Sequence, residues 1–253
     1  MSGPDPAETW GATTFVYGVT PADAAAPDLP GIADAPVRVV RGEDLAALVS
    51  EVDRAEVESA RALRAFARVL DAAIAAGPVV PLRFGTMVDG DDGVLSDVLG
   101  PHRDRFHQLF DRLGQHVEVK VKVNYDEDAI MRQLVASDPS IATRHRRIAG
   151  IDPDAAYYQR IELGEDIAAA LEQRRDRDAE AVYEALCAVA DDVSAAEPLN
   201  PHMVVNGTFL VRRSEVDAFQ ATIGSATRDR PELQVRFIGP LPPYSFSDVE
   251  PVG

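Results

Sequence analysis

Acidic residues near the middle of the chain have a spacing that metal binding could use. The segment DGDDG, residues 89–93, begins like a calcium loop. An EF-hand loop then needs an acidic or amide ligand, a glycine and a glutamate at its fifth, sixth and twelfth positions. Those positions hold Gly93, Val94 and Gly100. A solvated turn that begins a helix is therefore the better interpretation.

Histidine, arginine and cysteine residues offer three further possibilities. His102 and His107 are five residues apart, whereas two metal ligands on one helix prefer a spacing of four. The cluster RHRR, residues 144–147, has the charge to bind an acidic partner or a phosphate, but a solvated charge run that partly offsets the surrounding acids is the better interpretation. Cys187 lies in the apolar segment EALCAVA, so we expect a buried, inert thiol.

Sequence motifs of the common enzyme classes are missing. The chain has no G-x-G-x-x-G, G-x-S-x-G, H-E-x-x-H or C-x-x-C motif. Lys120 and Lys122 are its only lysines, and neither follows the glycines of a phosphate-binding loop. We therefore predict no catalytic residues, no metal and no cofactor, and a protein that is not an enzyme.

Charge and composition restrict the partners. The 253 residues carry a formal net charge of −17, which repels nucleic acid and anionic membrane surfaces. A hydrophobic content of 46% is that of a globular protein. With one cysteine, no signal-peptide pattern and no apolar run long enough to span a bilayer, the sequence predicts a cytoplasmic protein.

Hydrophobic periodicity predicts alternating strands and helices. A helix is expected over 57–76, with a buried stripe that includes Leu63, Phe66 and Leu70. A long helical region is expected over 154–195, and its charged middle, EQRRDRDAEA, is interpreted as solvated. A second helix should follow Asp91 and Asp92. Strands are predicted at 12–20, 37–40, 45–52, 79–88, 117–125, 203–211 and 233–238.

This alternation predicts an α+β protein of two domains, with mainly antiparallel sheets, helices packed on them and at least one ferredoxin-like arrangement. We place an N-terminal α+β domain at 1–115. A C-terminal domain at 116–253, of modified ferredoxin-like type, should contain the long helical region and an ordered tail. Pro81 has no N–H to donate, so its strand should lie at an edge, be bulged or begin pairing after the proline.

The tail contains three prolines within four residues, followed by two aromatic residues. Pro240, Pro242 and Pro243 have the spacing of a ligand for aromatic grooves, which is one explanation. The other is that the prolines fix an extended backbone and that Tyr244 and Phe246 pack onto the protein as a cover. We expect both aromatic rings to be substantially buried.

Five motifs in order resemble the gas vesicle protein GvpL/GvpF family. They are VVPLRFGTMV at 79–88, VEVKVKVNYDEDA at 117–129, YYQRIELGEDIAAAL at 157–171, VVNGTFLVRR at 204–213 and GPLPPYSF at 239–246. The resemblance covers nearly the whole chain. It implies an accessory or minor structural role in forming gas vesicles, with the hydrophobic shell protein and other gas vesicle proteins as partners, and association with the gas vesicle.

The motif cores supply the residues expected to bind partners or to hold the structure. They are Pro81, Leu82, Arg83, Phe84, Gly85, Tyr157, Tyr158, Arg160, Pro240, Pro242, Pro243, Tyr244 and Phe246. Two alternatives remain open. One is an α+β enzyme with an unrecognised site that uses Arg83 or Arg160, and the other is an adaptor that binds through its proline motif.

Overall fold

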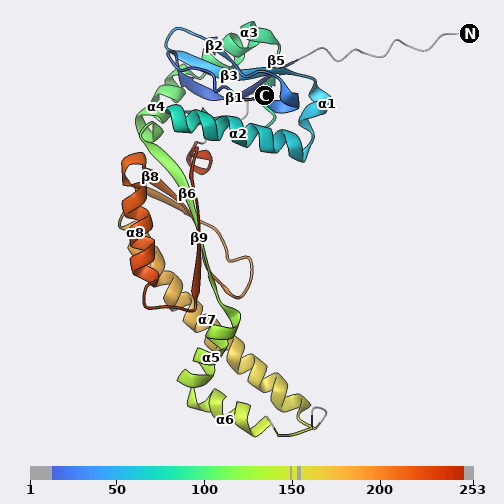
Figure 1. Ribbon diagram of the computed structural model, residues 1–253, viewed down its shortest axis with the longest axis vertical. Helices are drawn as coiled ribbons and strands as arrows, with labels where there is room; N and C mark the ends of the chain where they lie inside the picture. Colours follow the sequence, from blue (N-terminus) through green and yellow to red (C-terminus); the bar gives the residue numbers. More distant parts are fainter. Residues whose placement is uncertain (1–12, 149, 153–154, 248–253) are drawn as a thin grey trace, which may run out of the picture. The chain divides into compact units, whose positions relative to one another are not determined.

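The computed structural model describes residues 13–148, 150–152 and 155–247 (Figure 1). Contacts divide them into unit 1, which comprises residues 13–118 and 241–247, and unit 2, residues 119–240. Each unit combines a β-sheet with helices, so the predicted α+β class is confirmed. None of the helices in the described ranges combines the length and hydropathy that a membrane crossing requires.

The sheet of unit 1 is built around β1 (Thr13–Pro21). This strand pairs antiparallel with β3 (Leu45–Val52), and β3 pairs antiparallel with β2 (Arg38–Arg41), which confirms the strands predicted at 37–40 and 45–52. The short strands β4 (Val80–Pro81) and β5 (Met87–Val88) both pair with β1. The strand order β2-β3-β1-β4 places Pro81 at an edge, as its missing N–H predicts.

The main helix of unit 1 is α2 (Ala60–Ala76), which follows the short α1 (Arg54–Val57). Ser59 caps α2 by accepting a hydrogen bond from the Ala62 N–H, and the helix ends at Gly77. Phe66 and Leu70 are buried as predicted, but Leu63 is 52% exposed, so its place in the buried stripe was wrong. Leu63 lies at the margin of the stripe and lines a surface groove.

The remaining helical segments of unit 1 are short. The helix predicted after Asp92 is divided into three segments, α3 (Gly90–Gly93), η2 (Val94–Leu99) and α4 (Arg103–Leu113). Two single turns complete the unit, η1 (Ile32–Asp34) and η4 (Tyr244–Phe246).

The sheet of unit 2 has the strand order β7-β8-β6-β9. Its strands are β6 (His116–Tyr125), β7 (Asp192–Ala195), β8 (Met203–Arg212) and β9 (Leu233–Leu241). The valines of β6 are buried at alternate positions, as the sequence predicts. Glu118, which lies between two of these valines and points to the other face of the strand, is also fully buried.

Five helical segments accompany this sheet: α5 (Glu127–Ser137), α6 (Pro139–Ile148), α7 (Tyr157–Cys187), η3 (Arg213–Glu215) and α8 (Val216–Thr227). Rings of α7 and α8 pack on β8 at Phe209, with Tyr183 and Phe219 at 6.1 and 5.3 Å between centroids. The helix predicted to reach residue 195 ends at Cys187, because β7 pairs with β8 and removes 192–195 from it.

The contacts group the chain differently from the predicted boundaries of 1–115 and 116–253. The change of unit falls within β6, after Glu118, and the tail from Leu241 groups with unit 1 because its side chains pack there. The ferredoxin-like assignment and the folding of each part as a separate domain stay predictions.

Candidate functional site

The loop between β4 and β5 is held at both ends by β1. The Leu82 N–H donates to the Tyr17 carbonyl at 3.0 Å, and the Val16 N–H donates to the Thr86 carbonyl at 2.9 Å. Within the loop, Gly85 has φ +94°, a conformation that residues with a Cβ rarely adopt. The predicted motif residues Arg83, Phe84 and Gly85 therefore form a tight turn on the edge of the sheet.

Aromatic rings from this loop, the sheet and the tail gather around Phe66 of α2. The Phe66 ring centroid lies 5.3 Å from that of Phe84, 5.9 Å from Phe15 and 6.0 Å from Tyr17. The Tyr244 ring lies 6.3 Å away. Aromatic pairs at these separations stabilise beyond their buried area. Two predicted motifs, at 81–85 and 242–246, thus meet at a residue that neither motif contains.

The tail is an ordered cover. Pro242 and Pro243 are buried, and Phe246 is only 6% exposed. The Ser245 N–H donates to the buried Glu118 carboxylate at 2.7 Å, which explains why this position of β6 is not wet. The predicted burial is therefore confirmed for Phe246, whereas Tyr244 is half-buried. The faces of Pro242 and Pro243 that an aromatic groove would bind are occupied by the protein itself.

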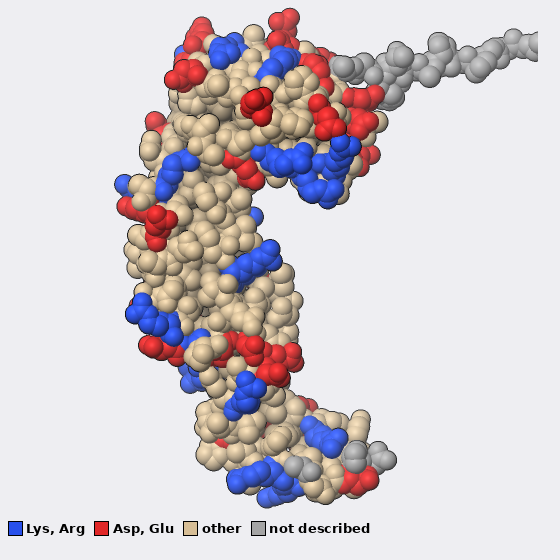
Figure 2. All heavy atoms as spheres, viewed as in Figure 1, with Lys and Arg blue, Asp and Glu red and all other residues tan. Residues whose placement is uncertain are grey.

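A groove of about 490 Å³ opens beside these rings in unit 1. We call it the α2 groove. Residues 81–84 line it together with Leu63, Phe66, Ala67, Tyr244 and Ser247. Its lining is largely apolar, Leu63 is half-exposed, and Arg83 is an exposed cation. Arg64 and Arg68 add exposed positive charge on α2, and Figure 2 shows basic side chains gathered on this face of the unit.

The Tyr244 hydroxyl lies buried at the groove without a hydrogen-bond partner among the described residues. Burial raises the pKa of this phenol, and the negative charges of Asp71 and Glu118 raise the pKa further. Burial also raises the pKa of the Asp71 carboxyl. The raised pKa keeps this hydroxyl protonated at neutral pH.

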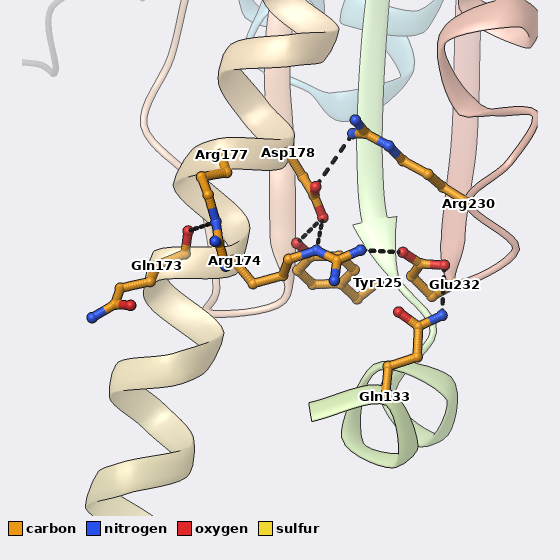
Figure 3. Close-up of polar contacts among 8 residues, drawn as sticks. All are labelled: Tyr125, Gln133, Gln173, Arg174, Arg177, Asp178, Arg230 and Glu232. Carbon is orange, nitrogen blue, oxygen red and sulfur yellow. Dashed lines mark hydrogen bonds and ion pairs between the residues drawn. The ribbon is translucent and has the colours of Figure 1, made fainter. Parts of the chain in front are cut away.

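A second cluster, in unit 2, joins four segments through polar and ionised side chains: β6, α5, α7 and the connection between α8 and β9 (Figure 3). Asp178 of α7 accepts hydrogen bonds from the Tyr125 hydroxyl at 2.7 Å and from Arg174 Nε at 2.8 Å. Arg174 also donates to Glu232 at 2.9 Å. Arg230 forms an ion pair with Asp178 at 3.3 Å, and the Gln133 amide donates to Glu232 at 2.9 Å.

The network has the character of a structural anchor. Asp178 and Glu232 are 5% and 1% exposed, and both carboxylates are bonded to guanidinium groups. Burial and the Asp178 carboxylate raise the pKa of the Tyr125 phenol, and Asp178 raises the pKa of Arg174. Removing one member of such a buried pair would leave the other charge without its partner, so the network ties these segments together. The interpretation of the charged run of α7 as solvated is therefore wrong at Arg174 and Asp178.

The other predicted site residues do not line the α2 groove. Tyr157, Tyr158 and Arg160 are exposed on the first turn of α7, in unit 2. Pro240 is exposed in β9. Sequence reasoning missed Phe66 as the centre of the ring cluster. It also missed Glu232, whose local sequence carries no signal of burial.

The remaining candidate groups form ordinary contacts. Asp91, in the segment DGDDG, pairs with Arg38 at 2.6 Å. His107 lies 2.7 Å from Asp44, which also pairs with Arg103. Within the described ranges, no group of three or more His, Cys, Asp and Glu side chains is placed to hold a metal. Cys187, the last residue of α7, is exposed, contrary to the prediction of a buried thiol.

The fold and the site together describe an α+β protein. Its motif residues pack against one another and form hydrogen bonds. The family model described as gas vesicle synthesis protein GvpL/GvpF matches residues 13–248. The chain belongs to this family, which confirms the resemblance seen in its motifs, and it has a role in gas vesicle formation.

Individual relatives agree with this assignment. Gas vesicle protein F of Streptomyces sp. (strain CB03234) is 37% identical over 242 residues, which are 92% of this chain and 99% of the relative. Gas vesicle protein L of the same strain is 30% identical over 266 residues, with 93% and 92% covered. The crystal structure of GvpF from Anabaena sp. PCC7120 shares the fold, with a TM-score of 0.77, 23% identity and coverage of 94% of this chain and 99% of that one.

Proposed function

We propose that this protein is an accessory or minor structural protein that binds the hydrophobic shell protein, and other gas vesicle proteins, during vesicle assembly. The observation that carries the proposal is the α2 groove. Its apolar lining is built on a helix and a sheet edge, and the half-exposed Leu63 leaves apolar surface to be covered. An apolar segment of a shell subunit is the kind of chain that such a groove accommodates.

The acidic surface suits this role. A shell subunit that exposes apolar surface before assembly is prone to aggregate, and a bound protein with a net charge of −17 opposes that aggregation by repulsion. Two modes of holding the subunit follow from the sequence, strand addition at an edge and covering of apolar surface. The edge strand β4 has only two residues, and one of them, Pro81, has no N–H to donate, so it offers little for strand addition. The α2 groove therefore favours the covering mode.

We propose further that the protein acts without catalysis, in the cytoplasm during assembly and at the gas vesicle. Membership of a gas vesicle synthesis family supports this, as does the pairing of the buried ionised groups of unit 2. An enzyme would instead convert a metabolite in a way that depends on Arg83 or Arg160. A proline-motif adaptor would need Pro242 and Pro243 to leave the positions in which they are buried.

Comparison within one organism favours the F type over the L type. The chain is 37% identical to protein F of the Streptomyces strain and 30% identical to its protein L. We therefore expect this chain to restore vesicles in a strain that lacks its F protein and not in a strain that lacks its L protein. Restoration of the L-deficient strain alone would reverse the assignment.

Co-expression with the shell protein tests the binding proposal. The tagged chain should recover the shell protein, and Leu63→Asp should reduce the recovery at least tenfold, because a carboxylate in the apolar groove costs its desolvation. Leu199→Asp is the matched control, since Leu199 is 72% exposed in unit 2. The proposal would be overturned if the unaltered chain, Leu63→Asp and Leu199→Asp recovered equal amounts of shell protein, or if the unaltered chain recovered no shell protein.

A further inference from the structure

The α2 groove combines an apolar lining with positive charge. Arg83 is the single charged side chain among the described residues that line it. The lining belongs to the segments 60–70, 81–88 and 241–247, which contain four arginines and neither aspartate nor glutamate. In a chain with a net charge of −17, these segments are a local reversal of sign.

Two elements place arginines beside the apolar lining. Arg83 lies in the loop between β4 and β5, and its neighbours Leu82 and Phe84 both line the groove. Arg64 lies on α2 three residues before Ala67, another lining residue, and residues three apart are neighbours on a helix surface. Both arginines are exposed. A chain bound in the groove therefore lies beside one guanidinium of the loop and, at the margin, one of the helix.

The charges of these arginines are not used by the rest of the described chain. Arg64, Arg68 and Arg83 form no ion pair with any residue of the described ranges. Two acids, Asp71 and Glu118, act on the Tyr244 side of the groove, and neither pairs with these arginines. Glu118 is buried and accepts a hydrogen bond from the backbone of the tail. The guanidinium groups are thus available to a partner.

A guanidinium group within an apolar lining selects for a carboxylate. Arginine binds a carboxylate through two parallel hydrogen bonds, while its aliphatic stem packs against apolar side chains. A purely apolar segment in the groove would remove water from Arg83 without supplying a partner for its charge, which costs free energy. The acidic remainder of the chain repels a carboxylate. Pairing at the groove therefore also determines which part of a partner binds there.

We propose that the α2 groove recognises a segment of the shell subunit in which an aspartate or glutamate lies next to an apolar stretch. The apolar side chains cover Leu63 and Phe84, and the carboxylate pairs with Arg83. Arg64 and Arg68 attract the same carboxylate as the segment approaches. This inference rests on the proposed function, which takes the shell subunit as the partner, and adds the chemistry that selects the segment. Nucleic acid is disfavoured, because the charge of the whole chain repels phosphate backbones.

Charge reversal at Arg83 tests the proposal in the co-expression assay. Arg83→Glu should lower the recovery of shell protein about tenfold or more, because the carboxylate of the partner then meets a like charge. Arg105→Glu is the matched control, since Arg105 is an exposed arginine of unit 1 that does not line the groove, and it should leave the recovery unchanged. Arg83→Gln should lower the recovery less and weaken its dependence on salt, because salt screens a pair of charges. Circular dichroism checks that the variants fold, and Arg83→Gln replaces the reversal if Arg83→Glu does not.

Photocrosslinking in cells that assemble gas vesicles identifies the carboxylate. Leu63→benzoylphenylalanine places the probe in the α2 groove, and mass spectrometry locates the crosslinked residue of the partner. We expect a segment of the shell protein with an aspartate or glutamate beside the crosslinked residue. Replacing that acid with arginine should restore the recovery that Arg83→Glu loses.

The results separate this inference from the proposed function. The inference alone fails if Leu63→Asp reduces the recovery while Arg83→Glu leaves it unchanged, or if the crosslinked segment of the shell protein contains no acid. Both fail if the unaltered chain recovers no shell protein and the probe crosslinks to nothing. Both also fail if the probe crosslinks only to nucleic acid, to a second copy of this chain or to residues 248–253 of the same chain.

Discussion

Substitutions at two leucines of α2 distinguish a residue that stabilises the fold by packing from a residue that binds a partner. Leu70 is fully buried, whereas Leu63 is 52% exposed in the α2 groove. Leu70→Ala leaves a cavity in a closed core and should lower the free energy of unfolding by about 2–5 kcal/mol. Leu63→Ala leaves no closed cavity. Because full burial of a leucine contributes roughly 1.5–3 kcal/mol, half-burial limits the loss at Leu63 to about 1 kcal/mol.

Urea unfolding followed by circular dichroism measures both losses, provided that the m-value stays constant. We expect the opposite order in shell-protein recovery, where Leu63→Ala should lower the recovery relative to the unaltered chain. Leu70→Ala should leave it unchanged under conditions in which the variant is folded. Equal destabilisation by the two substitutions, or a larger loss at Leu63, would refute the assignment of Leu63 to an open groove.

Three further predictions concern the network, the buried phenols and the thiol. Asp178→Ala leaves buried partners unpaired and should lower the free energy of unfolding by about 3–5 kcal/mol in urea titrations. Asp176→Ala, at an exposed ion pair, should change it by less than about 1 kcal/mol, and equal losses would contradict the anchor role. Burial raises the pKa of the Tyr125 and Tyr244 phenols, so stability is fully present below the ordinary tyrosine pKa of about 10 and falls as pH rises above it. Unfolding at pH 9 to 11 should show this fall, and Tyr125→Phe with Tyr244→Phe should flatten it; an unaltered slope would count against the burial. Cys187 is exposed and should react with a thiol reagent in the folded protein, whereas reaction only after unfolding would show that it is covered.

Local sequence patterns predicted the elements well where one physical periodicity dominates. The alternating valines of β6 needed only the period of a strand to place one face inside. The stripe of α2 likewise predicted a helix and its buried side, apart from its marginal leucine. The end of α7 was misjudged, because pairing of β7 with β8 outweighs the helical preference of the residues that follow Cys187.

The candidate site was less predictable from local patterns. The motifs at 81–85 and 242–246 were recognised separately, but only the folded chain shows that Phe66 joins them. The exposure of Leu63 depends on which elements cover the margin of α2, and the helical period alone does not contain that information. Burial of Asp178 and Glu232 similarly requires guanidinium partners from other segments.

The sequence by itself determined the α+β class, the absence of the common enzyme motifs, the strongly acidic surface and the family, because these follow from composition, local periodicity and the order of motifs. The tertiary structure alone decided that the tail closes over Glu118, that the α2 groove stays open, and that charges of α7 form an anchor. The reason is that backbone geometry sets periodicity within a segment, whereas burial and pairing depend on contacts between segments far apart in the chain.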